Sequence, residues 1–126
     1  TTLFRSLAIG ALITNVALKN IIARIRPYEV VEGLKLLIEP QSDFSFPSGH
    51  TCASIGAALA MYPFLERKWG IPLVILAVLI SLSRLYVGVH YPTDVLGGAV
   101  VGAFAAWGAV RIVKHGLVRK AKKAEK

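Results

Sequence analysis

Residues 72–82 read PLVILAVLISL, a run without a charged side chain. Extended to residues 71–87, the run has about the length that a helix needs to cross the hydrocarbon core of a bilayer. Three further apolar segments, residues 3–25, 48–65 and 92–113, have a similar length. The second of them is rich in Ala and Gly and would also suit a buried helix of a soluble protein. The sequence therefore predicts an all-α, integral membrane helical bundle with four transmembrane helices.

The composition of the whole chain is typical of a membrane protein. Hydrophobic residues make up 55% of the 126 residues, and the mean hydropathy is +0.59. The net charge of +8 could suggest nucleic-acid binding, but the densest basic run, RKAKKAEK at 119–126, follows an apolar segment as membrane-flanking tails do. We expect a single domain over residues 1–126, a basic cytoplasmic tail over 114–126, and no nucleic-acid partner. Cys52 is the single cysteine, so the chain has no internal disulfide.

A polar motif, SRLYVGVHYPTD at residues 83–94, follows the opening stretch. Arg84 falls at the end of an apolar helix, where a charge is unfavourable and usually functional. His90 and Asp94 flank a helix start at Pro92, so the carboxylate can accept one imidazole N–H and leave the other nitrogen as a base or nucleophile. The alternative is that Asp94 only caps the helix and His90 is an interfacial residue.

A second motif, KNIIARIRP at residues 19–27, lies at the end of the first predicted helix. Lys19 and Arg26 are seven residues, or two helical turns, apart and should share a face from which both can reach one anion. Interfacial cations that extend to lipid headgroups would have the same pattern. Arg24, expected on a different face, fits that alternative better.

The third motif is PSGH at residues 47–50. Pro47 and Ser48 are favoured at a helix start. Free backbone N–H groups at a helix start bind anions, and Gly49 permits close approach. His50 would then lie in the first turn, beside a bound anion. An ordinary capped helix with an incidental histidine has the same sequence.

Helix direction brings the three motifs together. Because consecutive membrane spans alternate in direction, all three motifs fall at one membrane face. Most other cations fall at the opposite face, which the positive-inside rule assigns to the cytoplasm. They are Arg5, Arg67, Lys68, Arg111, Lys114, Arg119, Lys120, Lys122, Lys123 and Lys126. We expect a multi-pass protein of the cytoplasmic membrane whose site lies on the extracytoplasmic side.

Together the motifs contain the groups that phosphoryl transfer needs. One histidine, held by a carboxylate, can attack phosphorus while the other protonates the leaving oxygen, and the cations offset the charge of the transition state. The sequence contains no His, Cys, Asp or Glu cluster with metal-ligand spacing, so we expect no metal and no cofactor.

The ordered motifs resemble the phosphatidic acid phosphatase type 2 superfamily, which includes lipid phosphate phosphatases and vanadium haloperoxidases. The family pattern is Lys, six residues, Arg-Pro; then Pro-Ser-Gly-His; then Ser-Arg, five residues, His, three residues, Asp. Every specified position is matched. The matching residues are Lys19, Arg26, Pro27, Pro47, Ser48, Gly49, His50, Ser83, Arg84, His90 and Asp94.

The resemblance implies a metal-independent phosphatase that works through a phosphohistidine. His90 would be the nucleophile, Asp94 its orienting partner, and His50 the acid that protonates the leaving group and then the base that activates water. The phosphate ligands would be Lys19, Arg26, Ser48, Gly49 and Arg84. Membrane members usually have six spans, so the four predicted here would form the C-terminal part of an N-terminally short family core.

The expected partners are a lipid phosphate substrate and the membrane lipids. The candidates are polyprenyl diphosphate, phosphatidylglycerol phosphate, phosphatidic acid and diacylglycerol pyrophosphate, and an extracytoplasmic site slightly favours the polyprenyl carrier. One alternative is a catalytically impaired membrane protein that binds lipid phosphate. Another, disfavoured by the apolar spans, is a vanadate-dependent peroxidase. Gly98 and Gly102 form a GxxxG face that predicts close helix packing, either within the bundle or in a homo-oligomer.

Overall fold

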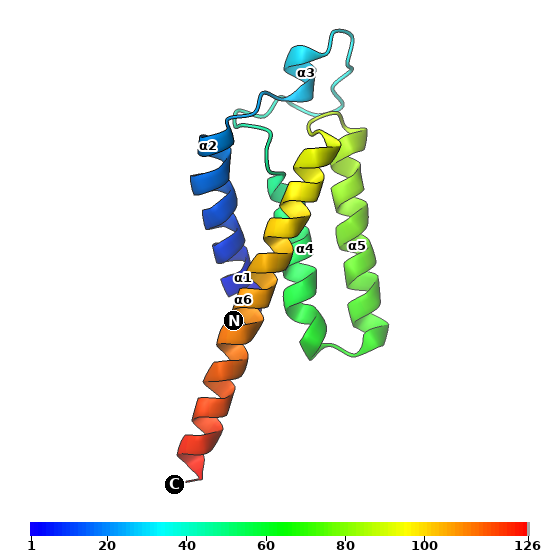
Figure 1. Ribbon diagram of the computed structural model, residues 1–126. Coiled ribbons are helices and arrows are strands. Elements are labelled where there is room, and N and C mark those ends of the chain that lie inside the picture. The colour runs from blue at the N-terminus through cyan, green and yellow to red at the C-terminus, as the bar shows by residue number, and fades with distance from the viewer. Residues whose placement is uncertain (126) are drawn as a thin grey trace.

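The computed structural model describes residues 1–125 and, over these residues, is all-helical as predicted (Figure 1). The first helix is continuous and has three parts: Thr2–Ala11 (α1), the wider π-helical turns of Leu12–Leu18 (η1), and Lys19–Ile22 (α2). The later elements are Pro27–Val30 (α3), Gly49–Met61 (α4) with the 3₁₀ turn Tyr62–Phe64 (η2), Arg67–Tyr86 (α5) and Pro92–Ala124 (α6).

The long helices alternate in direction, as the sequence predicts. The end of α2, the start of α4, the end of α5 and the start of α6 lie at one end of the bundle, together with α3 and its loop (Figure 1). The N-terminus lies toward the opposite end, and the last part of α6 projects beyond it. Helix α4 packs against α1, α5 and α6 and is therefore the central helix.

The surface of the bundle is suited to a membrane. Three segments, Thr2–Val30, Arg67–Tyr86 and Pro92–Ala124, contain enough apolar length to cross a bilayer. Helix α4, which is 13 residues long, falls short of that length and lies in the centre of the bundle. Large apolar side chains point outward along the other helices, a surface that would be unfavourable in water. Examples are Leu12, Val16, Ile75, Leu79, Leu82, Leu96, Val100 and Phe104.

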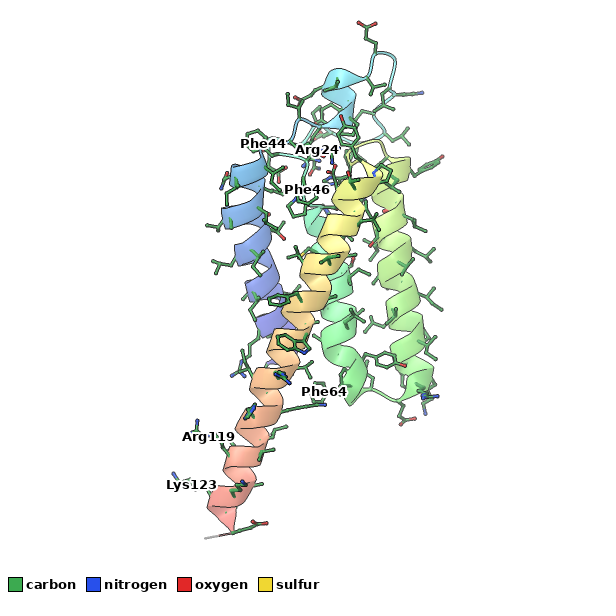
Figure 2. The ribbon with its side chains drawn as sticks, in the orientation of Figure 1. Arg24, Phe44, Phe46, Phe64, Arg119 and Lys123 are labelled. Carbon is green, nitrogen blue, oxygen red and sulfur yellow. The ribbon has the colours of Figure 1, made fainter. Side chains whose placement is uncertain are left out.

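Four helix ends differ from the predicted ones by three residues or more: α4 ends at Met61 instead of residue 65, α5 begins at Arg67 instead of residue 71, and the ends of the first helix and of α6 also differ. The first helix ends at Ile22 instead of residue 25, because Ala23 adopts a left-handed conformation (φ 47°, ψ 44°) that turns the chain before Pro27. Helix α6 continues to Ala124, so nearly all of the predicted tail over residues 114–126 is helical, consistent with the high helix propensity of its Lys and Ala residues. Arg119 and Lys123 lie on this projecting part (Figure 2). Lys126 lies outside the described residues.

Small residues form the core between α4 and α6. A Cβ atom on Gly98 would lie 2.5 Å from the backbone oxygen of Ser48, and one on Gly102 would lie 2.6 Å from that of Cys52. Ala105, farther along α6, is fully buried. The predicted GxxxG face is therefore used within the bundle, and α4 already occupies the surface through which a homo-oligomer was considered.

Replacing Gly98 or Gly102 by Ala should destabilise the protein by about 1–3 kcal/mol, because the added methyl group meets backbone that can move only if the two helices separate. Thermal unfolding in detergent would measure the effect. Gly116→Ala is the matched control on the same helix, because no atom lies within 4 Å of its Cβ position. Equal midpoints of thermal unfolding for all three variants would contradict the close packing of α4 against α6.

Candidate active site

The break at Ala23 determines where the cations of the first motif lie. Lys19, in α2, is buried, and Arg26 lies beyond the break in an extended conformation and is only 1% exposed. Arg26 donates from Nε to the backbone oxygen of Asp43 (2.9 Å) and from Nη1 to that of Val89 (3.0 Å). Both cations line one cavity. The predicted common helical face does not bring them together, because the helix ends between them.

The second motif begins α4. The Ser48 hydroxyl caps the helix by accepting from the backbone N–H of Thr51 (3.4 Å), and it is fully buried. Its own backbone N–H donates to the backbone oxygen of Asp94 (2.9 Å) and so joins the start of α4 to the start of α6. Gly49 and His50 face the cavity, and a Cβ atom on Gly49 would lie 4.0 Å from Lys19 Nζ.

The third motif places His90 between Arg26 and Asp94. His90 Nε2 lies 3.5 Å from Arg26 Nη1, and His90 Nδ1 lies 3.7 Å from Asp94 Oδ2, too far for a hydrogen bond. Nδ1 is buried without a hydrogen-bond partner. Asp94, which is fully buried, packs behind His90 and accepts from the Ser45 hydroxyl and from the backbone N–H of Tyr91 (2.7 Å). The carboxylate thus faces one ring nitrogen, and the other faces Arg26, which lines the same cavity as His90.

Burial, followed by the nearby Arg26 guanidinium, lowers the pKa of His90 from its ordinary value of 6.5 to about 4, although Asp94 opposes this shift. His90 is therefore neutral at pH 7. One of its ring nitrogens then carries a free lone pair, which a nucleophile or a base requires.

Arg84, also in the third motif, lies in the last turn of α5 and is half-buried. Its Nε donates to the Ser83 hydroxyl at 3.3 Å. The positive charge of Arg84 acts electrostatically on His50. Arg84 is not one of the described residues that line the cavity. The structure therefore gathers Lys19, Arg26, His50 and His90 on one cavity and leaves Arg84 at its periphery.

The cavity has a volume of about 390 Å³ and extends away from this cluster. It continues between the first helix and α4, where its wall includes Leu7, Gly10, Ala11 and Ala53. Over the whole cavity the walls are more apolar than polar, although Ser6, Thr14 and Asn15 of the first helix also line it. One end can therefore hold an anion while the remainder accommodates an apolar group. Across residues 1–125, no group of three or more His, Cys, Asp or Glu side chains is arranged to hold a metal ion.

Asp43 lies between the two cations of the first motif. Its carboxylate accepts from Arg26 Nη2 at 2.6 Å and forms an ion pair with Lys19 Nζ. Burial alone would raise the pKa of Asp43, but the hydrogen bonds from Lys19 and Arg26 outweigh burial and lower it below its ordinary value of 3.8. An ionised carboxylate thus occupies the cations that a phosphate would need.

Sequence reasoning missed three residues of the site. Asp43 and Ser45, which donates to Asp94, lie in the loop before α4 and belong to none of the three motifs. Arg24 was expected to point toward lipid headgroups, and this expectation is wrong: its Nη1 lies 2.9 Å from Asp94 Oδ1. The break at Ala23 redirects Arg24, and no Gly or Asn marked that break in the sequence.

Known proteins share both the sequence and the fold of this chain. The sequence model of the PAP2 superfamily matches residues 1–116. The chain is similar to an undecaprenyl-diphosphatase from Sulfolobus acidocaldarius, with 36% identity over 120 residues that cover 94% of this chain and 57% of the relative. It is also similar to the undecaprenyl-diphosphatase BcrC of Bacillus subtilis, with 42% identity, covering 74% of this chain and 47% of the relative. The chain spans about half the length of these curated relatives.

A crystal structure shares the fold. It is that of a transmembrane PAP2-type phosphatidylglycerolphosphate phosphatase from Bacillus subtilis, which superposes with a TM-score of 0.73 and 30% identity. The superposition covers 90% of this chain and 58% of the other. The bundle described above is therefore an architecture known from membrane phosphatases.

Replacing Asp43 by Asn should strengthen the binding of inorganic phosphate roughly tenfold. The change removes a negative charge that competes for Lys19 and Arg26, and two unit charges at a separation of about 4 Å repel each other by on the order of 1 kcal/mol or more. Isothermal titration calorimetry with phosphate would measure it. Glu39→Gln makes the same charge change at an exposed position of the same loop and should have little effect. Weaker binding by the Asn variant would mean that Asp43 orders the cations instead of competing for them.

Proposed function

The chain belongs to the PAP2 superfamily, and from this membership and the geometry of the site we propose that it forms the catalytic part of an integral-membrane lipid phosphatase. One observation carries the proposal: Lys19, Arg26, His50 and His90 line a single cavity at one end of the helical bundle. Two cations and two histidines are the groups that bind a phosphate, attack it and protonate its leaving group. The phosphatase names of the similar proteins support this reaction class.

The terminal phosphate would bind at the cationic end of the cavity. Lys19 and Arg26 would contact the phosphate oxygens once the phosphate has displaced the Asp43 carboxylate from them. The backbone at Gly49 would approach the phosphate at the start of α4. Ser48 would contribute through the helix start that its hydroxyl caps. Arg84, at the end of α5, would approach from the side of His50. These groups would offset the charge on the equatorial oxygens in the transition state.

The reaction would proceed in two steps through a phosphohistidine. In the first, the lone pair of His90 Nε2 attacks phosphorus, the bond from phosphorus to the leaving oxygen breaks, and His50 gives that oxygen a proton. In the second, His50 takes a proton from water, the water oxygen attacks phosphorus, and the bond to His90 breaks to release phosphate. The neutral state of His90 suits it to the first step, and the Asp94 carboxylate would stabilise the positive ring that forms. No metal ion enters either step.

The substrate we favour is a polyprenyl diphosphate. Two of the similar proteins are named undecaprenyl-diphosphatases, and one of them matches 94% of this chain. The apolar arm of the cavity along Leu7, Gly10 and Ala11 could receive the start of a lipid tail, since it continues from the cationic end. Phosphatidylglycerol phosphate, phosphatidic acid and diacylglycerol pyrophosphate present the same terminal group and are the competing substrates.

The proposed location of the site is the extracytoplasmic side of the cytoplasmic membrane. Nine of the ten cations that the sequence assigns to the opposite face lie within the described residues, on helix ends remote from His90 or on the projecting part of α6. Figure 2 shows Arg119 and Lys123 at that remote end, whereas Arg24 lies near the site. The positive-inside rule places such an end in the cytoplasm.

Purified protein in detergent should release phosphate from undecaprenyl diphosphate faster than from the three competing lipids, with or without a chelator. His90→Ala should reduce the rate on the order of 10³-fold or more, because it removes the nucleophile. The matched control is His115→Ala, at an exposed position on the far part of α6, which should retain full activity. Full activity of His90→Ala would refute the mechanism, and loss of activity with chelator would indicate a metal.

Single-cysteine labelling in intact cells would test the orientation. Cys52→Ala leaves the chain without cysteine, and a new cysteine can then replace Glu39, in the loop near the site, or Lys120, on the far part of α6. A membrane-impermeant maleimide should label the Glu39→Cys protein in intact cells and the Lys120→Cys protein only after permeabilisation. The reverse pattern would place the site in the cytoplasm.

A further inference from the structure

Arg24 lies against the buried carboxylate behind the proposed nucleophile. The left-handed turn at Ala23 directs Arg24 toward the first turn of α6, where its Nη1 lies 2.9 Å from Asp94 Oδ1 and also donates to the Thr93 hydroxyl. The guanidinium stacks over the ring of Tyr91, with its central carbon 4.2 Å from the ring centroid. Figure 2 shows Arg24 at the end of the bundle near the start of α6.

The Asp94 carboxylate is completely enclosed, and both of its oxygens have donors. Oδ2 accepts from the Ser45 hydroxyl and from the backbone N–H of Tyr91, and Oδ1 accepts from Arg24. A buried carboxylate without an opposite charge is strongly unfavourable and tends to take up a proton instead. His90 cannot supply this opposite charge at pH 7, because the ring is neutral there. Within the described residues, Arg24 is the permanent cation that pairs with Asp94.

Arg24 does not contact the position where phosphate would bind. It lies outside the cavity that Lys19, Arg26 and His90 line, and it borders a separate shallow depression beside Phe46. Its side chain is 37% exposed, whereas the Asp94 side chain is not exposed at all. Any effect of Arg24 on catalysis must therefore pass through Asp94.

We propose that Arg24 is a positioning residue of the phosphoryl-transfer reaction, whose guanidinium compensates the charge of the buried Asp94 carboxylate and holds that carboxylate facing His90 Nδ1. This role rests on the proposed function. Arg24 Nη1 donates to Oδ1 and holds it, so Oδ2 remains directed toward the histidine. When His90 takes the phosphoryl group and becomes positive, the Asp94 carboxylate is already in place to stabilise it. Without Arg24, Oδ1 of Asp94 would lose the donor that holds the carboxylate in this orientation.

The first test compares Arg24→Gln with Arg24→Lys in the phosphatase assay with undecaprenyl diphosphate. Arg24→Gln should lower kcat by roughly 10- to 100-fold and leave KM nearly unchanged, because the interaction matters when charge develops on His90. Arg24→Lys keeps the charge and should recover most of the loss. Arg111→Gln is the matched control, since Arg111 also stacks on an aromatic ring of α6, that of Trp107, but far from the site. A rise in KM at constant kcat would overturn the proposal by indicating direct substrate binding.

The second test is a double-mutant cycle with Asp94→Asn. Arg24→Gln should add little to the loss already caused by Asp94→Asn, because both changes remove one interaction. Additive losses of kcat in this cycle would overturn the proposal. A second result would overturn it too: equal losses of kcat for Arg24→Gln and Arg24→Lys, with equal drops in the midpoint of thermal unfolding, would indicate a structural role. These results leave the proposed function intact. That function fails separately, and the role of Arg24 with it, if His90→Ala retains full activity.

Discussion

Close backbone contact between α4 and α6 fixes the relative position of the two histidines. Gly98 and Gly102 let the helices approach until a methyl group would not fit, and the Ser48 N–H donates across the interface to the backbone oxygen of Asp94. This contact sets the start of α4 beside the start of α6. His50, in the first turn of α4, and His90, just before α6, consequently face the same cavity. In a bilayer, where helices gain little from burying apolar surface against each other, such small-residue packing is the expected way to hold a geometry.

Charge pairing organises the rest of the site around that contact. Two carboxylates sit among the cations: Asp43 pairs with Lys19 and Arg26, and Asp94 pairs with Arg24. The pairs differ in how accessible they are. Asp43 is about half exposed, with 48% of its side chain accessible, and lies on a loop, so it can yield to an incoming anion. Asp94 is completely enclosed on a helix, so it can serve as a fixed partner of His90. A pairing of aspartate with arginine is thus an exchangeable contact at Asp43 and a permanent contact at Asp94.

Much of the bundle could be predicted from the sequence, because bilayer thickness sets helix length and apolar runs are easy to recognise. The alternation of the spans and the common location of the motifs followed from that alone. The path of residues 23–26 did not follow, because alanine is the best helix former and its identity does not indicate the left-handed conformation that Ala23 adopts. Lys19 and Arg26 line one cavity and both contact Asp43, but a chain turn brings them together instead of the helical periodicity that was predicted. For the same reason the position of Arg24 was predicted wrongly, and the loop that carries Asp43 and Ser45 had no periodic signal.

Phosphorylation of His90 is the step on which the proposed reaction depends, and trapping the phosphohistidine tests it most directly. Undecaprenyl diphosphate labelled with ³²P in its terminal phosphate would be mixed with a His50→Gln variant, in which hydrolysis of the intermediate should be slow, and the reaction quenched in alkaline detergent. We predict label on a single peptide that contains His90, stable in alkali and lost in acid as phosphohistidine is, and absent when His90→Ala is added to the same variant. Label on another residue, or turnover by the wild-type protein with unlabelled His90, would contradict the account.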